Sequence, residues 1–383
     1  MLKVRIGLLA IGLAGAGCPL FLAAATDKAV LDNLRTKAEA ALESGDFPSA
    51  AALLEQGLKI DPDWKDGLWA MGLALYQNDR YEAAVQYLSR LTRVDSGSGR
   101  GWALLGMCEF QLGRCESAVE HIDRADRLGI PANQGLGYTA WLNRGLAKIQ
   151  LGQYGTAAVL LSKLAPRENA EERDRLVTAL GFAAMGLNLN EPLAPERQDQ
   201  MRTVGEAYYQ SGAGDRAAAR ATFQKLCEKY PKASLLHYAF GSLLLRWFED
   251  EEAEREFHAE LANTPDSFQA RLGIAYASLR SGAKDDPTSG LAAAREAVRM
   301  RPDTYQAHLY LGQLLLRNDQ PAAALDELEA ARRLSPSTSL VRFALAEAYR
   351  ALKRNKEADR ELHEFKRLKA LEEPALEEGA APK

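Results

Sequence analysis

The side chains that most often carry out chemistry in proteins are present in this chain, but they are not grouped. The five histidines are His121, His237, His258, His308 and His363. None of them belongs to a His-Glu-x-x-His motif or to a cysteine–histidine cluster with zinc-ligand spacing. Ser281 and Lys284 have the serine–lysine spacing of some acyl-transfer enzymes, but no companion motif accompanies them. The sequence therefore predicts a protein that is not an enzyme, with no catalytic residues and no cofactor or metal.

A glycine cluster and the charge pattern exclude two further kinds of site. Gly97, Gly99 and Gly101 are close together, but Trp102 stands where the last glycine of a dinucleotide-binding Gly-x-Gly-x-x-Gly would be. The net charge is −4, and basic and acidic residues are interspersed along the chain. A nucleic-acid groove needs a basic stripe, and a membrane-surface site needs a polybasic patch. We expect neither nucleic acid nor a membrane surface as a partner.

The N-terminus has the three parts of a secretory signal. Lys3 and Arg5 precede an uncharged run over residues 6–25, and three alanines ending at Ala25 offer a small-residue cleavage site. We expect residues 1–25 to be a signal peptide and the mature chain to be periplasmic or secreted in a bacterium, without further membrane insertion. The alternative is an uncleaved inner-membrane anchor formed by residues 6–25, since about 20 apolar residues suffice to span a bilayer.

The four cysteines leave two questions open. Cys18 lies in the N-terminal run and leaves a lipoprotein as a third possibility, although the leucine usual three positions before such a cysteine is absent. Beyond residue 25 the chain keeps Cys108, Cys115 and Cys227. Cys108 and Cys115 flank one predicted turn and could pair in an oxidising compartment. The other interpretation, that they are small buried apolar side chains, fits the packing position of Cys115 better.

The elements that position all these residues recur with a fixed period. Pro231, Pro265, Pro302 and Pro336 are spaced 34, 37 and 34 residues apart. A small residue stands 24 positions before three of these prolines and an alanine 12 positions before them, namely Ala207, Gly241 and Gly312, and Ala219, Ala253 and Ala324. A period of 20 to 50 residues indicates a stack of small units in which each unit contacts its neighbours.

Residues 305–338 show what one unit is made of. Apolar residues at helical spacing, Leu309 to Leu316, are followed by a polar break and then by Pro321 at a position suited to the first turn of a helix. A second apolar stripe follows and ends before Pro336. The unit is predicted to be two antiparallel helices, with Gly312 and Ala324 on facing helices so that the backbones approach closely.

This pattern resembles the tetratricopeptide repeat, a family of 34-residue helix pairs with small residues at positions 8 and 20 and a proline at position 32. About nine units match in one phase. They are residues 31–64, 65–98, 99–132, 138–171, 200–233, 234–267, 268–304, 305–338 and 339–372. The resemblance implies an all-α solenoid of antiparallel helix pairs that forms a right-handed superhelix. His237 and His308 fall at position 4, a packing position, so they are interpreted as structural.

The phase is interrupted once, at residues 172–199. Residues 175–185 have the pattern of one helix, but Pro192 and Pro195 lie in the stretch that follows, and no second helix is visible there. The array would then have an N-terminal part (26–171), a degenerate unit or linker (172–199) and a C-terminal part (200–372). A lone helix inside one continuous superhelix is the other interpretation, and the sequence favours it slightly. The polar tail, residues 373–383, is predicted to be disordered.

The resemblance also implies where a partner would bind. In such arrays, positions 2, 5, 9 and 12 of the first helices usually face a concave groove. Carried over to this chain, these residues are Trp69, Leu73, Tyr76, Met107, Phe110, Leu142, Leu146, Tyr238, Tyr276, Leu309 and Gln313. The groove is predicted to be apolar and aromatic, and it lacks the Lys and Asn of arrays that clamp a C-terminal carboxylate.

These residues predict a non-catalytic scaffold that binds another protein. The partner would contribute an extended peptide or an amphipathic helix. The alternative function is a structural component of a cell-envelope assembly or polysaccharide-export complex.

Overall fold

The computed structural model describes residues 19–130, 135–167, 170–281 and 287–372. Within these ranges the chain forms nineteen α-helices and one 3-10 helix, η2 (Ala165–Arg167), and no strand. Residues 1–18 of the predicted signal peptide, Lys284 of the serine–lysine pair and the predicted tail, residues 373–383, lie outside the described residues. No described helix is both long and apolar enough to cross a bilayer.

Eighteen of the helices form nine antiparallel pairs, one for each predicted unit. The first helices of the pairs are α1 (Pro19–Glu43), α3 (Lys65–Gln77), α5 (Gly99–Gln111), α7 (Leu136–Gln150), α10 (Pro195–Gly212), α12 (Leu236–Arg246), α14 (Phe268–Ser281), α16 (Tyr305–Arg317) and α18 (Ser339–Ala351). The second helices are α2 (Phe47–Ile60), α4 (Tyr81–Val94), α6 (Cys115–Leu128), α8 (Tyr154–Ser162), α11 (Arg216–Lys229), α13 (Asp250–Asn263), α15 (Pro287–Met300), α17 (Pro321–Leu334) and α19 (Asn355–Glu372). The predicted all-α solenoid of helix pairs is confirmed.

The turn inside a pair closes the first helix and starts the second. In the unit of α16 and α17, Asp319 has a left-handed backbone with φ of 56°. The amides of Asp319 and Gln320 donate to the carbonyls of Leu316 and Leu315 at 3.1 and 2.9 Å, which satisfies the end of α16. Pro321 then occupies the first turn of α17, where its missing N–H costs little.

Glycine at position 8 lets the paired helices approach, as the sequence predicted. A Cβ on Gly312 would lie 2.5 Å from the side chain of Leu328 and 3.3 Å from the carbonyl oxygen of Ala324. Gly72 and Gly145 are covered in the same way by Leu88 and Leu161. The space that a side chain would fill at position 8 is therefore taken by a leucine of the second helix.

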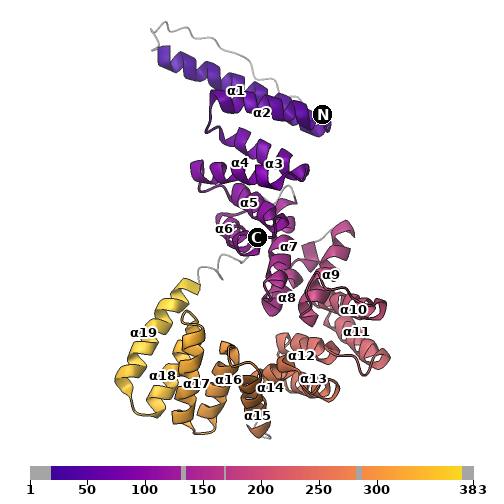
Figure 1. Ribbon diagram of the computed structural model, residues 1–383, viewed down its shortest axis with the longest axis vertical. Coiled ribbons are helices and arrows are strands. Elements are labelled where there is room, and N and C mark those ends of the chain that lie inside the picture. Colours follow the sequence, from indigo (N-terminus) through magenta and orange to yellow (C-terminus); the bar gives the residue numbers. More distant parts are fainter. Residues whose placement is uncertain (1–18, 131–134, 168–169, 282–286, 373–383) are drawn as a thin grey trace.

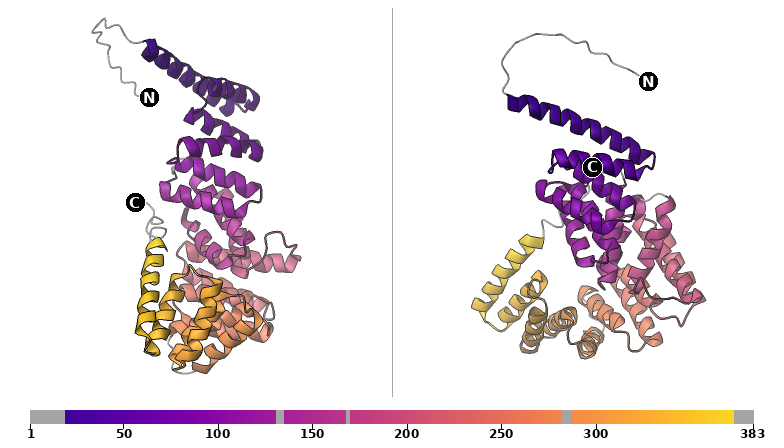
Figure 2. Two further views of the ribbon diagram at one scale, coloured as in Figure 1. Left: turned by 60° about the vertical axis from the view of Figure 1, so that its left-hand side comes forward. Right: turned by 45° about the horizontal axis from the view of Figure 1, so that its top comes forward.

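The pairs stack so that first helices contact first helices. In the C-terminal part, α12, α14, α16 and α18 contact one another in order, whereas successive second helices in the described ranges do not pack to a comparable extent. The helices on the concave side of a curved stack are the closer ones, so the first helices form the inner face. Figure 1 shows α1 to α6 stacked one beneath the next and α12 to α19 forming an arc below them, and Figure 2 shows α19 turned back towards the N-terminal stack.

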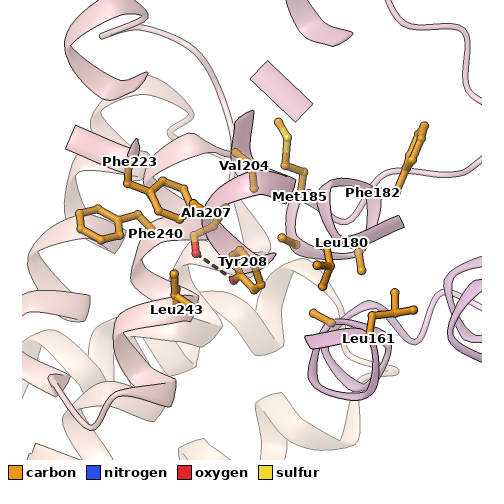
Figure 3. Packing of buried hydrophobic residues seen from close by; sticks show 14 of the residues in the cluster. Leu161, Leu180, Phe182, Met185, Val204, Ala207, Tyr208, Phe223, Phe240 and Leu243 are labelled. Atoms are coloured by element: carbon orange, nitrogen blue, oxygen red, sulfur yellow. Dashed lines mark hydrogen bonds between the residues drawn. The ribbon is translucent and has the colours of Figure 1, made fainter. Parts of the chain in front are cut away.

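Residues 172–199 contribute a long helix and a packed connection. The predicted helix at 175–185 is present as α9 (Ala170–Met185), and it begins five residues earlier. Pro195, which was expected to interrupt any helix, instead begins α10, because its fixed φ suits the first helical turn. Figure 3 shows Leu180 of α9 in one apolar cluster with residues of the flanking helices, and Leu187 of the connection belongs to the same cluster. One buried cluster therefore joins the helices on both sides of this stretch, and the division into two arrays stays a prediction.

Candidate functional site

Four of the eleven predicted groove residues are buried in the core. The exposed fractions are 9% for Trp69, 3% for Met107, 1% for Leu142 and 3% for Leu309. Three of these residues stand at position 5, where the first helix of the neighbouring unit covers the side chain. Trp69 also lies under the guanidinium of Arg100, 4.9 Å from the ring centroid. Because these side chains are covered by their own chain, they do not serve as contact residues for a partner, and that part of the prediction is corrected.

The other seven residues keep some contact with solvent. Leu73, Tyr76, Phe110, Leu146, Tyr238 and Gln313 are half-buried, and Tyr276 is 36% exposed. Tyr76 meets the edge of Tyr81 with ring centroids 5.6 Å apart. Burial raises the pKa of the Tyr76 phenol, so its hydroxyl stays neutral. All seven lie on first helices and six of them are apolar or aromatic, and that they line a groove and bind a partner stays a prediction.

Position 13 of three successive C-terminal units carries arginines that the sequence analysis did not single out. Arg280 donates from Nη1 to the carbonyl oxygen of Leu245, 2.8 Å away, and Arg317 donates to the carbonyl oxygens of Ser278 and Leu279. Each guanidinium thereby closes the carbonyl end of the preceding first helix, where a positive charge is favourable. In the first of these units, Arg246 instead donates to the hydroxyl of Ser162 at 3.0 Å. The sequence does show that position 13 differs between the two parts of the chain. It is arginine in these three C-terminal units and glutamine in three N-terminal units, at Gln77, Gln111 and Gln150.

Aromatic rings lie beside these arginines. The guanidinium carbon of Arg280 is 4.7 Å from the ring centroid of Phe248 and 5.6 Å from that of Tyr276. The ring of Tyr276 lies 5.3 Å from that of Tyr310, tilted by 31°. We call Phe248, Arg280, Tyr276 and Tyr310 the aromatic strip. It crosses three successive units, and of its members the sequence predicted only Tyr276 as a site residue.

Basic residues at position 4 hold the two helices of C-terminal units together. His308 faces Glu327 at 2.6 Å through Nδ1 and the carbonyl oxygen of Pro302 at 2.9 Å through Nε2. In the next unit, Arg342 donates to Glu361 and to the carbonyl oxygen of Pro336, both at 3.0 Å. The two residues are 34 positions apart and make equivalent contacts. The structural interpretation of His308 is thus supported, although polar contacts take the place of the expected apolar packing.

The last unit exposes a surface that other units cover. Phe343 occupies the position equivalent to Leu309, but within the described residues no first helix covers it as α18 covers Leu309, and Phe343 is 36% exposed. Its ring contacts that of Phe365 of α19 at 5.3 Å. Nearby in sequence, Leu340 is 58% exposed. These apolar side chains lie on the last described unit.

Nothing in the described ranges resembles a metal centre or a reactive thiol. No group of three histidine, cysteine or carboxylate side chains there could hold a metal ion. Cys108, Cys115 and Cys227 are free, and burial raises the pKa of both Cys108 and Cys227 to about 12, so these two thiols are poor nucleophiles. Cys115 donates to Gln150 at 2.8 Å. The possible pairing of Cys108 with Cys115 is absent from the structure.

One hollow on the surface is open to solvent. It measures about 630 Å³ and lies between the start of α10 and the turn from α11 to α12. Arg197 lines it and donates to the carbonyl oxygen of Ser234, 2.7 Å away, so this arginine fastens the turn. The remaining wall is mostly exposed side chains, and the hollow offers no enclosed site for a small substrate.

Comparison with solved structures finds helical-repeat proteins. A MamA from Desulfovibrio magneticus is 14% identical, with a TM-score of 0.41, and the match covers 47% of this chain and 98% of that one. YrrB, described as a TPR protein with an unusual peptide-binding site, is 18% identical with a TM-score of 0.39. The match covers 47% of this chain and 91% of YrrB. A chain of the Cut9–Hcn1 hetero-tetramer of the APC/C is 14% identical with a TM-score of 0.35. The match covers 88% of this chain and 79% of that one. These values carry no inference about function, and no curated protein matches the chain.

Family models give the clearer result. Three models described as tetratricopeptide repeat match residues 41–108, residues 204–233, and residues 283–338 together with 312–359. The matches fall in both the N-terminal and the C-terminal units, and they agree with the helix pairs and the glycine contacts of the structure. The chain is a tetratricopeptide-repeat protein.

Proposed function

We propose that this protein is a non-catalytic scaffold that binds another protein on the inner face of its first helices. The observation that carries the proposal is the set of apolar side chains that stay partly exposed on two runs of neighbouring first helices, α3 to α7 and α14 to α16. They are Leu73 and Tyr76 on α3, Phe110 on α5, Leu146 on α7, Tyr276 on α14 and Tyr310 on α16. Isolated exposed apolar residues are normal on any protein, but a row of them on neighbouring elements marks a contact surface.

The chemistry of this row suits a protein partner better than a small molecule. Tyrosine is enriched among the residues that contribute most to protein–protein binding, because its large flat ring loses little conformational freedom. An extended peptide or one face of an amphipathic helix could lie along it and contact several units at once.

A pair of substitutions tests this proposal in the N-terminal units. Tyr76→Ala combined with Phe110→Ala removes two half-buried rings from the inner face. We expect the amount of any partner that co-purifies with the native protein to fall at least tenfold, while the melting temperature falls only a few degrees. The matched control is Tyr87→Ala on the second helix α4, which should leave co-purification unchanged. Equal partner recovery from all three proteins would contradict the proposal.

The destination of the protein is a separate proposal. We propose that residues 1–25 direct export and that the mature protein begins at Thr26, on the grounds of the charged start, apolar run and small-residue site of the sequence. N-terminal sequencing of the protein from its native cells tests this. A first residue at position 26 supports cleavage, whereas an intact N-terminus in the membrane fraction supports the anchor alternative.

A further inference from the structure

The last described unit, made of α18 and α19, repeats a face that is covered in the unit before it. In the unit of α16 and α17, Leu309, Leu328 and Ala331 are buried in one cluster with Val341 and Leu345 of α18. The next first helix therefore covers position 5 of the first helix and positions 24 and 27 of the second helix. Figure 1 shows α18 and α19 at the end of the arc that α12 to α19 form.

The same positions of the last described unit carry large apolar side chains that are less buried. Phe343 stands at position 5, and Leu362 and Phe365 stand at positions 24 and 27. Phe343 is 36% exposed, and Leu362 and Phe365 keep partial contact with solvent. Leu340, one helical turn before Phe343, is 58% exposed. We call these four residues the end face.

The end face is unusual for a surface in contact with water. A unit at the end of a stack normally presents polar side chains, because no further unit covers it. Here the rings of Phe343 and Phe365 contact each other with centroids 5.3 Å apart, and Leu340 is exposed beside them. Several exposed apolar side chains on neighbouring helices indicate a surface that binds something.

The chain that directly follows α19 starts from the right place to cover the end face. After α17, four residues (335–338) turn the chain back, and α18 then runs over the preceding unit. The segment after α19 starts from the equivalent end of its own unit. α19 ends at Glu372, two residues before Pro374, and the residue before a proline disfavours helical backbone. The topology of the repeat would direct the following residues over the end face.

The sequence of this segment does not suit a further first helix. Pro374 and Pro382 enclose seven residues, whereas the shortest first helix of the described units, α12, has 11. Gly379 lies between the two prolines and lowers helix propensity further. Leu376 is the one large apolar residue of the segment. The sequence therefore favours an extended segment with a single apolar anchor.

The length of the segment fits the distance to the end face. Phe365, whose ring contacts Phe343, stands seven residues before Glu372, which is about 10 Å along α19 at a rise of about 1.5 Å per residue. Four extended residues, 373–376, span about 13 Å. After a turn, the side chain of Leu376 can therefore reach the end face.

We propose that residues 374–378 fold back over the end face, with Leu376 packed against Phe343, in the place that a further first helix would take. This inference is independent of the proposed function. Glu347 and Arg350 follow on the same side of α18 with opposite charges, so apolar contact rather than charge holds the segment. The segment shields the end face from water and from a second copy of the chain. The predicted disorder of the tail then applies only to the residues beyond 378.

A disulfide between introduced cysteines tests this contact in the full-length chain. Leu340→Cys is combined with Leu376→Cys or, as the control, with Ala381→Cys, and mild oxidation is followed by peptide mass spectrometry. We expect the bridge between positions 340 and 376 to form at least tenfold faster than the bridge between positions 340 and 381. A free tail would give rates within a few-fold of each other, because closing a flexible loop depends weakly on its length. Rates that similar overturn the proposal.

Two further measurements separate the tail from a second copy as the occupant. Leu376→Asp should speed amide hydrogen exchange in α18 several-fold, since a charged residue does not pack on an apolar face. Ala380→Asp is the control and should leave exchange in α18 unchanged. Light scattering should give the same mass for the wild type and for Phe343→Asp. A mass that falls by half with Phe343→Asp, or exchange that is unchanged by Leu376→Asp, overturns the proposal.

Discussion

Gly181 of α9 and Gly205 of α10 meet with their backbones in contact. A Cβ on Gly205 would lie 2.0 Å from the carbonyl oxygen of Val177 and 2.9 Å from the amide nitrogen of Gly181. A Cβ on Gly181 would lie 2.2 Å from the carbonyl oxygen of Met201. Because backbone atoms oppose each glycine, a neighbouring side chain cannot simply rotate away. This crossing fastens the extra helix α9 to the first C-terminal unit.

The glycine crossing predicts that Gly205→Ala destabilises the protein. The added methyl must push α9 and α10 apart. We expect this to lower the free energy of unfolding by about 1–3 kcal/mol, the usual cost of overpacking a core. Thermal unfolding followed by circular dichroism measures the effect. Gly155→Ala in α8 is the control, since nothing lies within 4 Å of its added methyl and alanine favours a helix. A melting temperature unchanged by Gly205→Ala would contradict the close contact.

The fold was predictable because close packing of the paired helices requires small residues at fixed positions of each repeat. Gly312 and Ala324 must be small wherever two helices pack this closely, so the period appears directly in the sequence. The start of α10 was mispredicted because Pro195 suits both a helix start and a break. The position of α9 against α10 depends on Gly181 and Gly205, and neither glycine stands out among those of the chain.

The candidate site was less predictable because exposure depends on how neighbouring units stack. Leu309 and Phe343 occupy one repeat position, yet the first is packed against α18 and buried and the second is 36% exposed. Phe248 was missed because its left-handed conformation is set by its place in the turn, and its exposure is set by the packing of the surrounding helices. The signal was present, since Gly or Asp fills most of the equivalent positions.

The ion pair of His237 and Glu256 predicts a stability contribution that depends on pH. Nδ1 of His237 lies 2.7 Å from Glu256, and this hydrogen bond raises the pKa of His237 above 6.5. A raised pKa in the folded state gives stability that is full below about pH 6.5 and is lost as the pH rises through the folded value. His237→Gln should therefore lower the melting temperature more at pH 6 than at pH 9.

A control histidine makes this pH test specific. The His363 side chain is 82% exposed, so His363→Gln should give a small difference that is similar at both pH values. The measurement is the melting temperature of the wild type minus that of each variant from pH 6 to pH 9. A difference for His237→Gln that stays constant over this range, or grows towards pH 9, would refute the coupling.

The equivalence of His308 and Arg342 predicts which substitution position 308 tolerates. His308→Arg should preserve the melting temperature within a few degrees, because an arginine makes the same two contacts one unit later. His308→Leu should cost about 1–3 kcal/mol, since it leaves Glu327 and the carbonyl oxygen of Pro302 without this partner. Chemical unfolding compares the two variants. Similar losses of stability for both variants would show that these two contacts are not what holds the unit together.

The amide of Asn143 predicts a stabilising substitution. The side chain is 1% exposed, and neither its nitrogen nor its oxygen has a hydrogen-bond partner among the described residues. Asn143→Leu should therefore raise stability by about 1–3 kcal/mol. Asn318→Leu is the matched control and should not stabilise, because Asn318 donates to the carbonyl oxygen of Leu314 at 2.8 Å. A lower melting temperature for Asn143→Leu would mean that this amide is satisfied in solution.

Binding on the inner face is the central claim, and site-specific photo-crosslinking in the native cells tests it most directly. A photoreactive residue placed at the partly exposed Tyr276 stands on a first helix, and one placed at the exposed Arg255 of α13 stands on a second helix. We predict a discrete crosslinked partner from position 276 and none from position 255. Crosslinks of equal yield from both positions, or from position 255 alone, would contradict binding on the inner face.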